Sequence, residues 1–231
     1  MTLAFLEALL GAPRPVIMEV KRQDGHGNDL FGGRSVAEIV ATYEAAGAPC
    51  ISVVTGRWFG GATDLLREVA GLTDLPLLQK DFITRKTQLI DAVDGGAAAV
   101  LLTAAVLPGT TLRKLIAASL ALGLTPFVEV TNEAEIESLS DAEHCVVAIN
   151  NKNIKARETG PPSIERSLAL LPSVLRTGTR CPVSASGVDR PDVAAALLEA
   201  GFAALLIGTG LLRAANVQGW LDELDRWRAG M

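Results

Sequence analysis

Short and almost wholly apolar segments recur eight times along this chain of 231 residues, and their repetition constrains the fold more than any other feature. Strands that are apolar at every position must be covered on both faces. Between them lie stretches with helical spacing, several of which end in glycine just before the next strand, as helices commonly do. The expected strands are residues 15–20, 50–55, 76–80, 98–103, 125–130, 145–150, 181–186 and 203–208, and the clearest helical stretches are 35–47, 63–72, 85–96, 111–123 and 190–201.

Alternating strand and helix units of this kind predict a parallel sheet, and eight units in this length match a closed (β/α)₈ TIM barrel of the α/β class. An open doubly wound sheet is the alternative. No G-x-G-x-x-G segment follows the first expected strand, which counts against a dinucleotide-binding fold. Because no linker or low-complexity segment interrupts the pattern, we expect residues 1–231 to form a single barrel domain with a short N-terminal extension.

Charge and hydropathy exclude several classes of partner. The net charge of -5 leaves no general basic surface for nucleic acid, so an anionic ligand would need a local cluster of basic residues. No run approaches the ~20 apolar residues of a membrane span, and the first residues lack the features of a secretory signal. The sequence therefore predicts a cytoplasmic protein that binds neither nucleic acid nor membranes.

The cysteines and histidines do not form a metal-binding pattern. Cys50, Cys145 and Cys181 each begin a β-branched run and have no paired spacing. His26 and His144 lie far apart, in unrelated contexts, and are expected at the surface. We therefore expect three buried, reduced thiols and no metal site.

Charged and amide side chains gather where the expected strands end. The first strand ends in Glu19 and Lys21, the third in Lys80, the fifth in Glu129 and the sixth in Asn150. One such lysine would fit a structural ion pair equally well. Two lysines and two glutamates from three strands, at the end of a barrel where chemistry occurs, predict an acid–base site, because burying them costs free energy unless they pair or meet a ligand.

The last two strands end in the segments "SASG" and "IGTG". Small residues let backbone N–H groups approach a ligand closely, and a short helix beginning near Gly210 would direct its positive end at an anion. Either segment alone is weak evidence, since glycine turns are common. Together, in the two loops where such barrels commonly hold phosphate, they predict an anion site at Ser186, Gly187, Gly208 and Thr209.

The ordered segments "EVKR", "LPLLQKDFI", "TPFVEV", "AINNKN", "SASGV" and "AALLIGTGLL" resemble those of the indole-3-glycerol phosphate synthase family, with a match from about residue 15 to residue 215. The resemblance implies a carbon–carbon lyase without a cofactor. Members close 1-(2-carboxyphenylamino)-1-deoxyribulose 5-phosphate into an indole, with loss of carbon dioxide and water. The implied partner is therefore a small aryl-sugar phosphate, and we expect a monomer or weak homo-oligomer.

The resemblance also implies a role for each candidate residue. Lys80 would be the general acid that protonates the ketose carbonyl, and Glu129 would be its acid–base partner in the dehydration. Lys21 would protonate the departing oxygen, Glu19 would orient the lysines, and Asn150 would hold substrate hydroxyls. The implied phosphate ligands are Ser186, Gly187, Gly208 and Thr209, and the implied substrate-binding residues are Phe59 and Phe82 beside the aromatic ring, with Lys152 for the carboxylate.

Four features depart from the family pattern. After "EVKR" the chain has "QDGHG" where the family has a Ser-Pro-Ser segment. Ala185 stands where the family has a glutamate, and Lys152 replaces an arginine whose planar fork can hold a carboxylate bidentately. The residues before the first strand are also fewer than in the family, which normally has a longer helical extension over the active-site mouth.

These departures favour a diverged paralogue that performs a related ring closure on an altered substrate, as in specialised metabolism. Two alternatives stay open. One is the ordinary indole-3-glycerol phosphate synthase of tryptophan biosynthesis, and the other is a catalytically silent barrel that binds a sugar phosphate.

Overall fold

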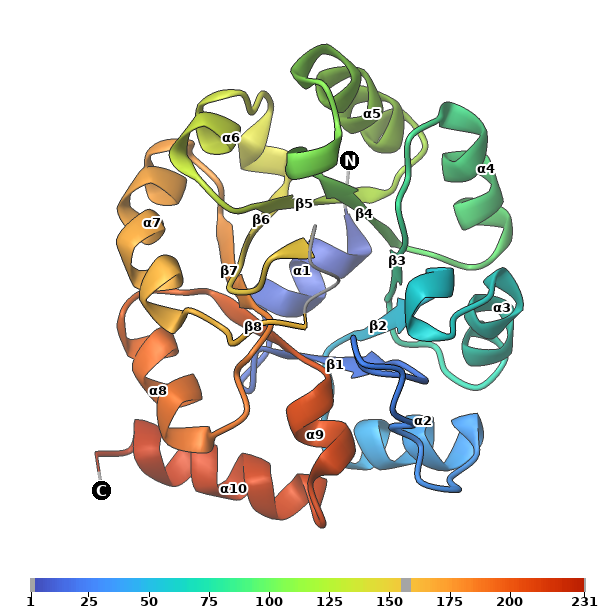
Figure 1. The fold of residues 1–231 in the computed structure, drawn as a ribbon, viewed down its shortest axis with the longest axis vertical. Coiled ribbons are helices and arrows are strands. Elements are labelled where there is room, and N and C mark those ends of the chain that lie inside the picture. Colours follow the sequence, from blue (N-terminus) through green and yellow to red (C-terminus); the bar gives the residue numbers. More distant parts are fainter. Residues whose placement is uncertain (1–2, 155–158, 231) are drawn as a thin grey trace.

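The computed structural model describes residues 3–154 and 159–230, which include a closed barrel of parallel strands (Figure 1). The strands follow one another around the barrel in chain order, and β8 pairs with β1 to close it. Closure confirms the predicted TIM barrel and rules out the open doubly wound sheet. The strands are β1 (Val16–Val20), β2 (Ile51–Val54), β3 (Leu77–Lys80), β4 (Ala99–Thr103), β5 (Thr125–Val130), β6 (Val146–Asn150), β7 (Cys181–Ala185) and β8 (Ala204–Ile207).

Helices surround the barrel in an outer ring, except α1, which lies at its centre in this view (Figure 1). α2 shows how local sequence sets a helix start: the Ser35 hydroxyl accepts the Glu38 N–H, and the Glu38 carboxylate accepts the Ser35 N–H. The helices are α1 (Ala4–Leu10), α2 (Val36–Ala45), α3 (Thr63–Ala70), α4 (Lys86–Asp94), α5 (Gly109–Ala121), α6 (Glu133–Glu137), α7 (Ile164–Arg176), α8 (Pro191–Glu199), α9 (Thr209–Arg213) and α10 (Val217–Arg228), with short 3₁₀ turns η1 (Arg57–Phe59), η2 (Ala104–Val106) and η3 (Ala142–His144).

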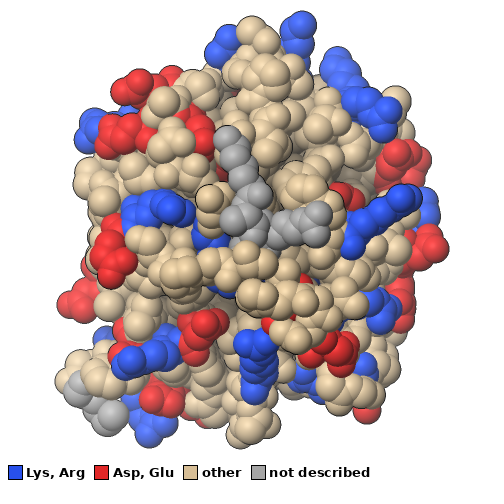
Figure 2. Space-filling model, in the orientation of Figure 1, with Lys and Arg blue, Asp and Glu red and all other residues tan. Residues whose placement is uncertain are grey.

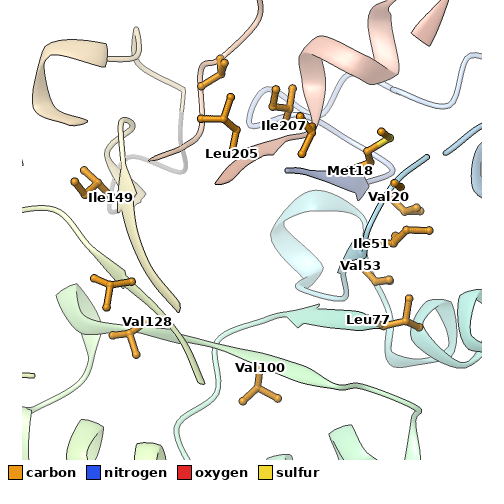
Figure 3. Packing of buried hydrophobic residues seen from close by; sticks show 14 of the residues in the cluster. Met18, Val20, Ile51, Val53, Leu77, Val100, Val128, Ile149, Leu205 and Ile207 are labelled. Carbon is orange, nitrogen blue, oxygen red and sulfur yellow. The ribbon is translucent and has the colours of Figure 1, made fainter. Parts of the chain in front are cut away.

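Two apolar cores lie on opposite faces of the strands, which explains why the strands are apolar at successive positions. Figure 3 shows members of the outer core, such as Met18 and Ile51, which pack between the strands and the helices. The inner core fills the barrel and includes Ile17, Leu78 and Phe127. Because successive strand residues alternate between the two faces, the parity of each strand-end residue decides whether it faces the barrel interior.

α1 closes the N-terminal end of the barrel. Phe5, Leu6 and Leu9 of this helix pack in the inner core with residues at the starts of strands, such as Cys181, which begins β7, and Cys50, which directly precedes β2. The Phe5 ring lies edge-on to that of Phe127, with centroids 6.4 Å apart and planes at 85°. α1 therefore lies at the end opposite the carboxyl ends of the strands, and it does not cover the mouth where the site is expected.

The structure also tests the expectations about the cysteines and about membrane-spanning segments. Cys50, Cys145 and Cys181 are buried and unpaired thiols, as predicted. Burial raises the pKa of the Cys145 and Cys181 thiols to about 12. Within the part of the chain that the structure describes, no helix has both the length and the apolar character needed to cross a bilayer.

Replacing Phe5 by alanine should destabilise the barrel by about 3–5 kcal/mol, the range for removing a fully buried aromatic side chain. The side chain is 0% exposed and contacts the inner core. Urea unfolding followed by circular dichroism measures the change. Leu175→Ala is the matched control, because this outward-facing side chain is 49% exposed and should cost about 0.5 kcal/mol or less. Equal costs for the two variants would show that α1 is not part of the core.

Candidate active site

A buried carboxylate between two lysines forms the centre of the site. One oxygen of Glu19 on β1 lies 3.1 Å from the Lys21 Nζ, and the other lies 3.1 Å from the Lys80 Nζ at the end of β3. The Ser52 hydroxyl of β2 approaches the second oxygen at 3.4 Å. The side chains of Glu19, Lys21 and Lys80 are 1%, 8% and 11% exposed, so they form a nearly dry ion cluster, called here the lysine–glutamate cluster.

Mutual attraction keeps the Glu19 carboxylate of this cluster in its charged form. Burial alone would raise the pKa of Glu19, but the ammonium groups of Lys80 and Lys21 outweigh it and lower that pKa to about 2. Glu19 is therefore ionised at neutral pH. One carboxylate between two ammonium groups leaves the cluster with a net positive charge, which suits it to an anionic ligand and to proton donation.

Gly208, which directly follows β8, leaves room for the Glu19 side chain. A Cβ placed on Gly208 would collide with Oε1 of Glu19. Any side chain at this position would therefore push the carboxylate away from the lysines. Sequence reasoning assigned Gly208 to phosphate binding alone, because packing against a residue so distant in sequence leaves no local signal.

A polar cavity of about 260 Å³ opens onto the lysine–glutamate cluster and includes all four predicted phosphate ligands, Ser186, Gly187, Gly208 and Thr209. Ser186 has a φ of 68°, a left-handed conformation that costs a non-glycine residue about 1–3 kcal/mol and is concentrated at functional sites. Gly187 has a φ of 76°, and a Cβ there would collide with Pro162. The structure thus brings the four residues together around one polar space.

An apolar cavity adjoins the polar one, and the two share Lys21 and Lys80. It is narrow, about 20 Å³, roughly the space of one water molecule. Lys21 Nζ lies 5.7 Å from the centre of the Phe59 ring, within cation–π range. The other residues that line it include Glu129, which is 1% exposed at β5, and the predicted aromatic residue Phe82, with Leu101 and Ile154.

Asn150 ends β6 and Lys152 follows two residues later, and the substrate roles expected of both stay predictions. The Asn150 side chain is buried and accepts the Lys152 N–H at 2.8 Å, and neither described cavity includes it in its lining. Its contact helps to shape the loop after β6. Lys152 lines the polar cavity and not the apolar one, so its charge faces the predicted phosphate end rather than the aromatic residues.

Ala185 at the end of β7 packs fully buried in the inner core, in register with Asn150 of β6 and Leu206 of β8. The end of β7 therefore has no carboxylate. The carboxylate that pairs with both lysines is supplied by β1, at Glu19.

Several residues of the polar cavity were not singled out as ligands from the sequence. His26 was expected only at the surface; it is exposed but also lines this cavity. Asp24 and Arg213 line it as well and pair with each other at 2.8 Å. The available signal for Arg213 was its position four residues after Thr209 in a helical segment, which places the two on one helix face.

Figure 2 shows acidic and basic side chains interspersed over the face seen in Figure 1, without a large area of a single sign. Such a surface does not concentrate anions by its overall charge. An anion bound at this cavity would be attracted by its lysines and arginine, and the expectation of a local basic cluster stays a prediction.

Glu19→Gln should destabilise the protein by about 3 kcal/mol or more at neutral pH, because two nearly buried ammonium groups lose the negative charge between them. The Glu19 pKa is lowered in the folded state, so its contribution is fully present above about pH 4.5 and is lost as the pH falls toward about 2. The advantage of the wild type over the variant should therefore shrink in that range. Urea unfolding of both proteins between about pH 7 and about pH 3 measures it, and a constant difference would contradict the assignment.

Comparison with known proteins gives the family and the fold. The family model described as indole-3-glycerol phosphate synthase matches residues 2–224. Indole-3-glycerol phosphate synthase 1 of Streptomyces coelicolor is 38% identical over 218 residues, with 94% of this chain and 79% of the relative covered. Indole-3-glycerol phosphate synthase of Exiguobacterium sp. is 37% identical over 214 residues, covering 90% and 81%.

Among solved structures, 3-hexulose-6-phosphate synthase from Salmonella typhimurium aligns with a TM-score of 0.67 at 13% identity, over 93% of this chain and 98% of that one. That likeness concerns the barrel fold alone. The sequence relatives do not support the expectation of a diverged paralogue with an altered substrate, and they favour the ordinary enzyme instead. The chain belongs to the indole-3-glycerol phosphate synthase family, a family of decarboxylating lyases.

Proposed function

We propose that this protein is an ordinary indole-3-glycerol phosphate synthase, which converts 1-(2-carboxyphenylamino)-1-deoxyribulose 5-phosphate into indole-3-glycerol phosphate, carbon dioxide and water. One observation supports this most strongly: a polar cavity and an apolar cavity meet at Lys21 and Lys80. The substrate has a phosphate at one end and an aromatic ring at the other. Its reacting carbonyl lies between them and would face the two ammonium groups.

In the first step, the ring carbon that bears the carboxylate attacks the ketose carbonyl carbon. Lys80 donates a proton to the carbonyl oxygen, so that the oxygen leaves the step as a hydroxyl group. Glu19 supports this role because its negative charge holds the ammonium group in place, 3.1 Å away, without taking the proton. General acid catalysis of this kind contributes about 10²–10⁴-fold to the rate.

Decarboxylation then restores the aromatic ring. The bond from the ring carbon to the carboxylate breaks, carbon dioxide departs, and the electron pair returns to the ring system. The apolar residues Phe59, Phe82 and Leu101 around the ring position favour this step, because a dry environment destabilises the carboxylate more than neutral carbon dioxide.

Loss of water completes the indole. Lys21 would protonate the departing hydroxyl while Glu129 accepts the proton released from the ring intermediate. Both residues line the apolar cavity, and Glu129 is almost fully buried. An aryl ring needs more space than this cavity now has, so we propose that the partly exposed Phe82 moves when the substrate enters.

The remaining candidate residues bind rather than react in this proposal. Ser186, Gly187, Gly208 and Thr209 hold the phosphate, and Lys152 adds a positive charge to the same cavity. Asn150 positions the loop that carries Lys152, through the 2.8 Å bond to its N–H. A cytoplasmic location and a monomeric or weakly associated state belong to the same proposal.

Lys80→Met should reduce kcat by about 100-fold or more, the effect of losing one general acid, while inorganic phosphate still binds the polar cavity. The rise of indole fluorescence during turnover of 1-(2-carboxyphenylamino)-1-deoxyribulose 5-phosphate measures kcat. Lys86→Met is the matched control, because Lys86 is exposed on α4 and lines neither cavity. A wild type that binds the substrate without forming an indole would contradict the proposed function, and full activity of Lys80→Met would contradict the role of that lysine.

A further inference from the structure

A carboxylate lines the cavity that is proposed to take a phosphate. Asp24, in the loop between β1 and α2, is 8% exposed and borders the same space as Ser186 and Thr209. An unpaired negative charge in this position would repel a dianion. Its presence therefore calls for a neutralising partner and for a reason why the loop contains it.

The loop itself supplies part of the reason. Oδ1 of Asp24 accepts the N–H groups of His26 and Asn28 at 2.9 and 3.0 Å, and Oδ2 accepts the Asn28 side-chain amide at 2.9 Å. Desolvation raises the pKa of Asp24, but these hydrogen bonds and the Arg213 charge outweigh it and lower that pKa to about 2. Asp24 is thus ionised, and it orders the turn that borders the cavity.

Arg213 is the neutralising partner. Its guanidinium donates to Oδ2 of Asp24 at 2.8 Å, although the two residues are 189 positions apart in sequence. It lies on α9 four residues after Thr209, so both side chains project from the same face of the helix and both line the cavity. The Arg213 side chain is 58% exposed, which leaves much of its guanidinium open to solvent and to other ligands.

The charges of the cavity show why this arginine matters for an anion. The described lining has four basic residues and three acidic ones, and two of the lysines already share Glu19. α9 is a single short turn of five residues, so its dipole adds little. The basic groups beyond the lysine–glutamate cluster are Lys152 and Arg213.

We propose that Arg213 is a phosphate-binding residue that serves Asp24 and the substrate phosphate together, and that Asp24 limits how strongly the site holds that phosphate. This inference rests on the proposed function only in that the polar cavity takes the phosphoryl group. In the empty site, the guanidinium pairs with Asp24 and orders the first loop. When a dianion binds, the exposed part of the same guanidinium faces the phosphate oxygens.

A purely structural pair would behave differently from this shared arginine. If the two side chains only fastened α9 to the first loop, removal of either one would loosen the cavity and weaken anion binding to the same extent. If Arg213 is shared, the two substitutions change the affinity for the anion in opposite directions. Asp24→Asn removes the repulsive charge, keeps an oxygen that can accept the N–H groups of His26 and Asn28, and releases Arg213 toward the anion.

The test is the affinity for inorganic phosphate, measured by calorimetry on the full chain at constant ionic strength. Arg213→Gln should weaken binding about three- to tenfold, and Asp24→Asn should tighten it by a similar factor, the size expected of one exposed unit charge. The double variant should fall between the two single variants. Arg180→Gln and Glu7→Gln are matched controls, because this exposed pair, 3.1 Å apart, lies at the opposite end of the barrel and should leave the affinity unchanged.

Equal weakening in Asp24→Asn and Arg213→Gln would overturn the proposal in favour of a structural fastening. Unchanged affinity in both would remove Arg213 from the anion site altogether. Thermal unfolding of each variant checks that the loop and barrel are retained. Since phosphate binding requires no turnover, these results stand apart from the indole assay. A protein that forms no indole can still show opposite shifts, and an active one can fail to show them.

Discussion

The carboxylate of Glu19, buried between Lys21 and Lys80, is the interaction on which the rest of the site depends. A buried ion cluster is weak evidence for stability, because desolvation of the charges offsets much of their attraction. Its value here is positional: the ends of β1 and β3 are held together so that two ammonium groups point into one space. Gly208 is part of this arrangement, since only a residue without a Cβ leaves room for the carboxylate. The ion pairs between β1 and β3 therefore require glycine at position 208, directly after β8.

The lysine–glutamate cluster also divides the mouth of the barrel into two environments. The cavity on one side is polar and the cavity on the other is apolar, and both share the lysines. A ligand with one anionic and one aromatic end can enter in only one orientation without placing its charge among Phe59, Phe82 and Leu101. In the proposed function, the two cavities orient such a ligand by solvation as well as by individual contacts, and its middle then faces the two lysines.

Much of this could be read from the sequence, for a physical reason. Strand periodicity fixes which face a side chain occupies, so Glu19, Lys80 and Glu129 could be assigned to one rim before any coordinates were known. The features that could not be predicted lie in loops and in the segment before the first strand. Periodicity does not give the position of Lys152 beside the polar cavity, nor the packing of α1 into the opposite end of the barrel. The preference for a diverged paralogue gave too much weight to single substitutions, such as Ala185, against a match that extends over nearly the whole chain.

The pairing of Asp24 with Arg213 joins the first loop to α9 beside the cavity that is proposed to hold the phosphate. A hydroxyl-rich loop could offer donors to a phosphate directly, whereas this loop uses a carboxylate to accept its own N–H groups. That choice stabilises the turn but introduces a charge of the wrong sign. An arginine can compensate because its planar group has five donors and can meet a carboxylate and a second anion at once. A lysine in the same place would offer a single point charge, so the shared role proposed for Arg213 depends on its planar group.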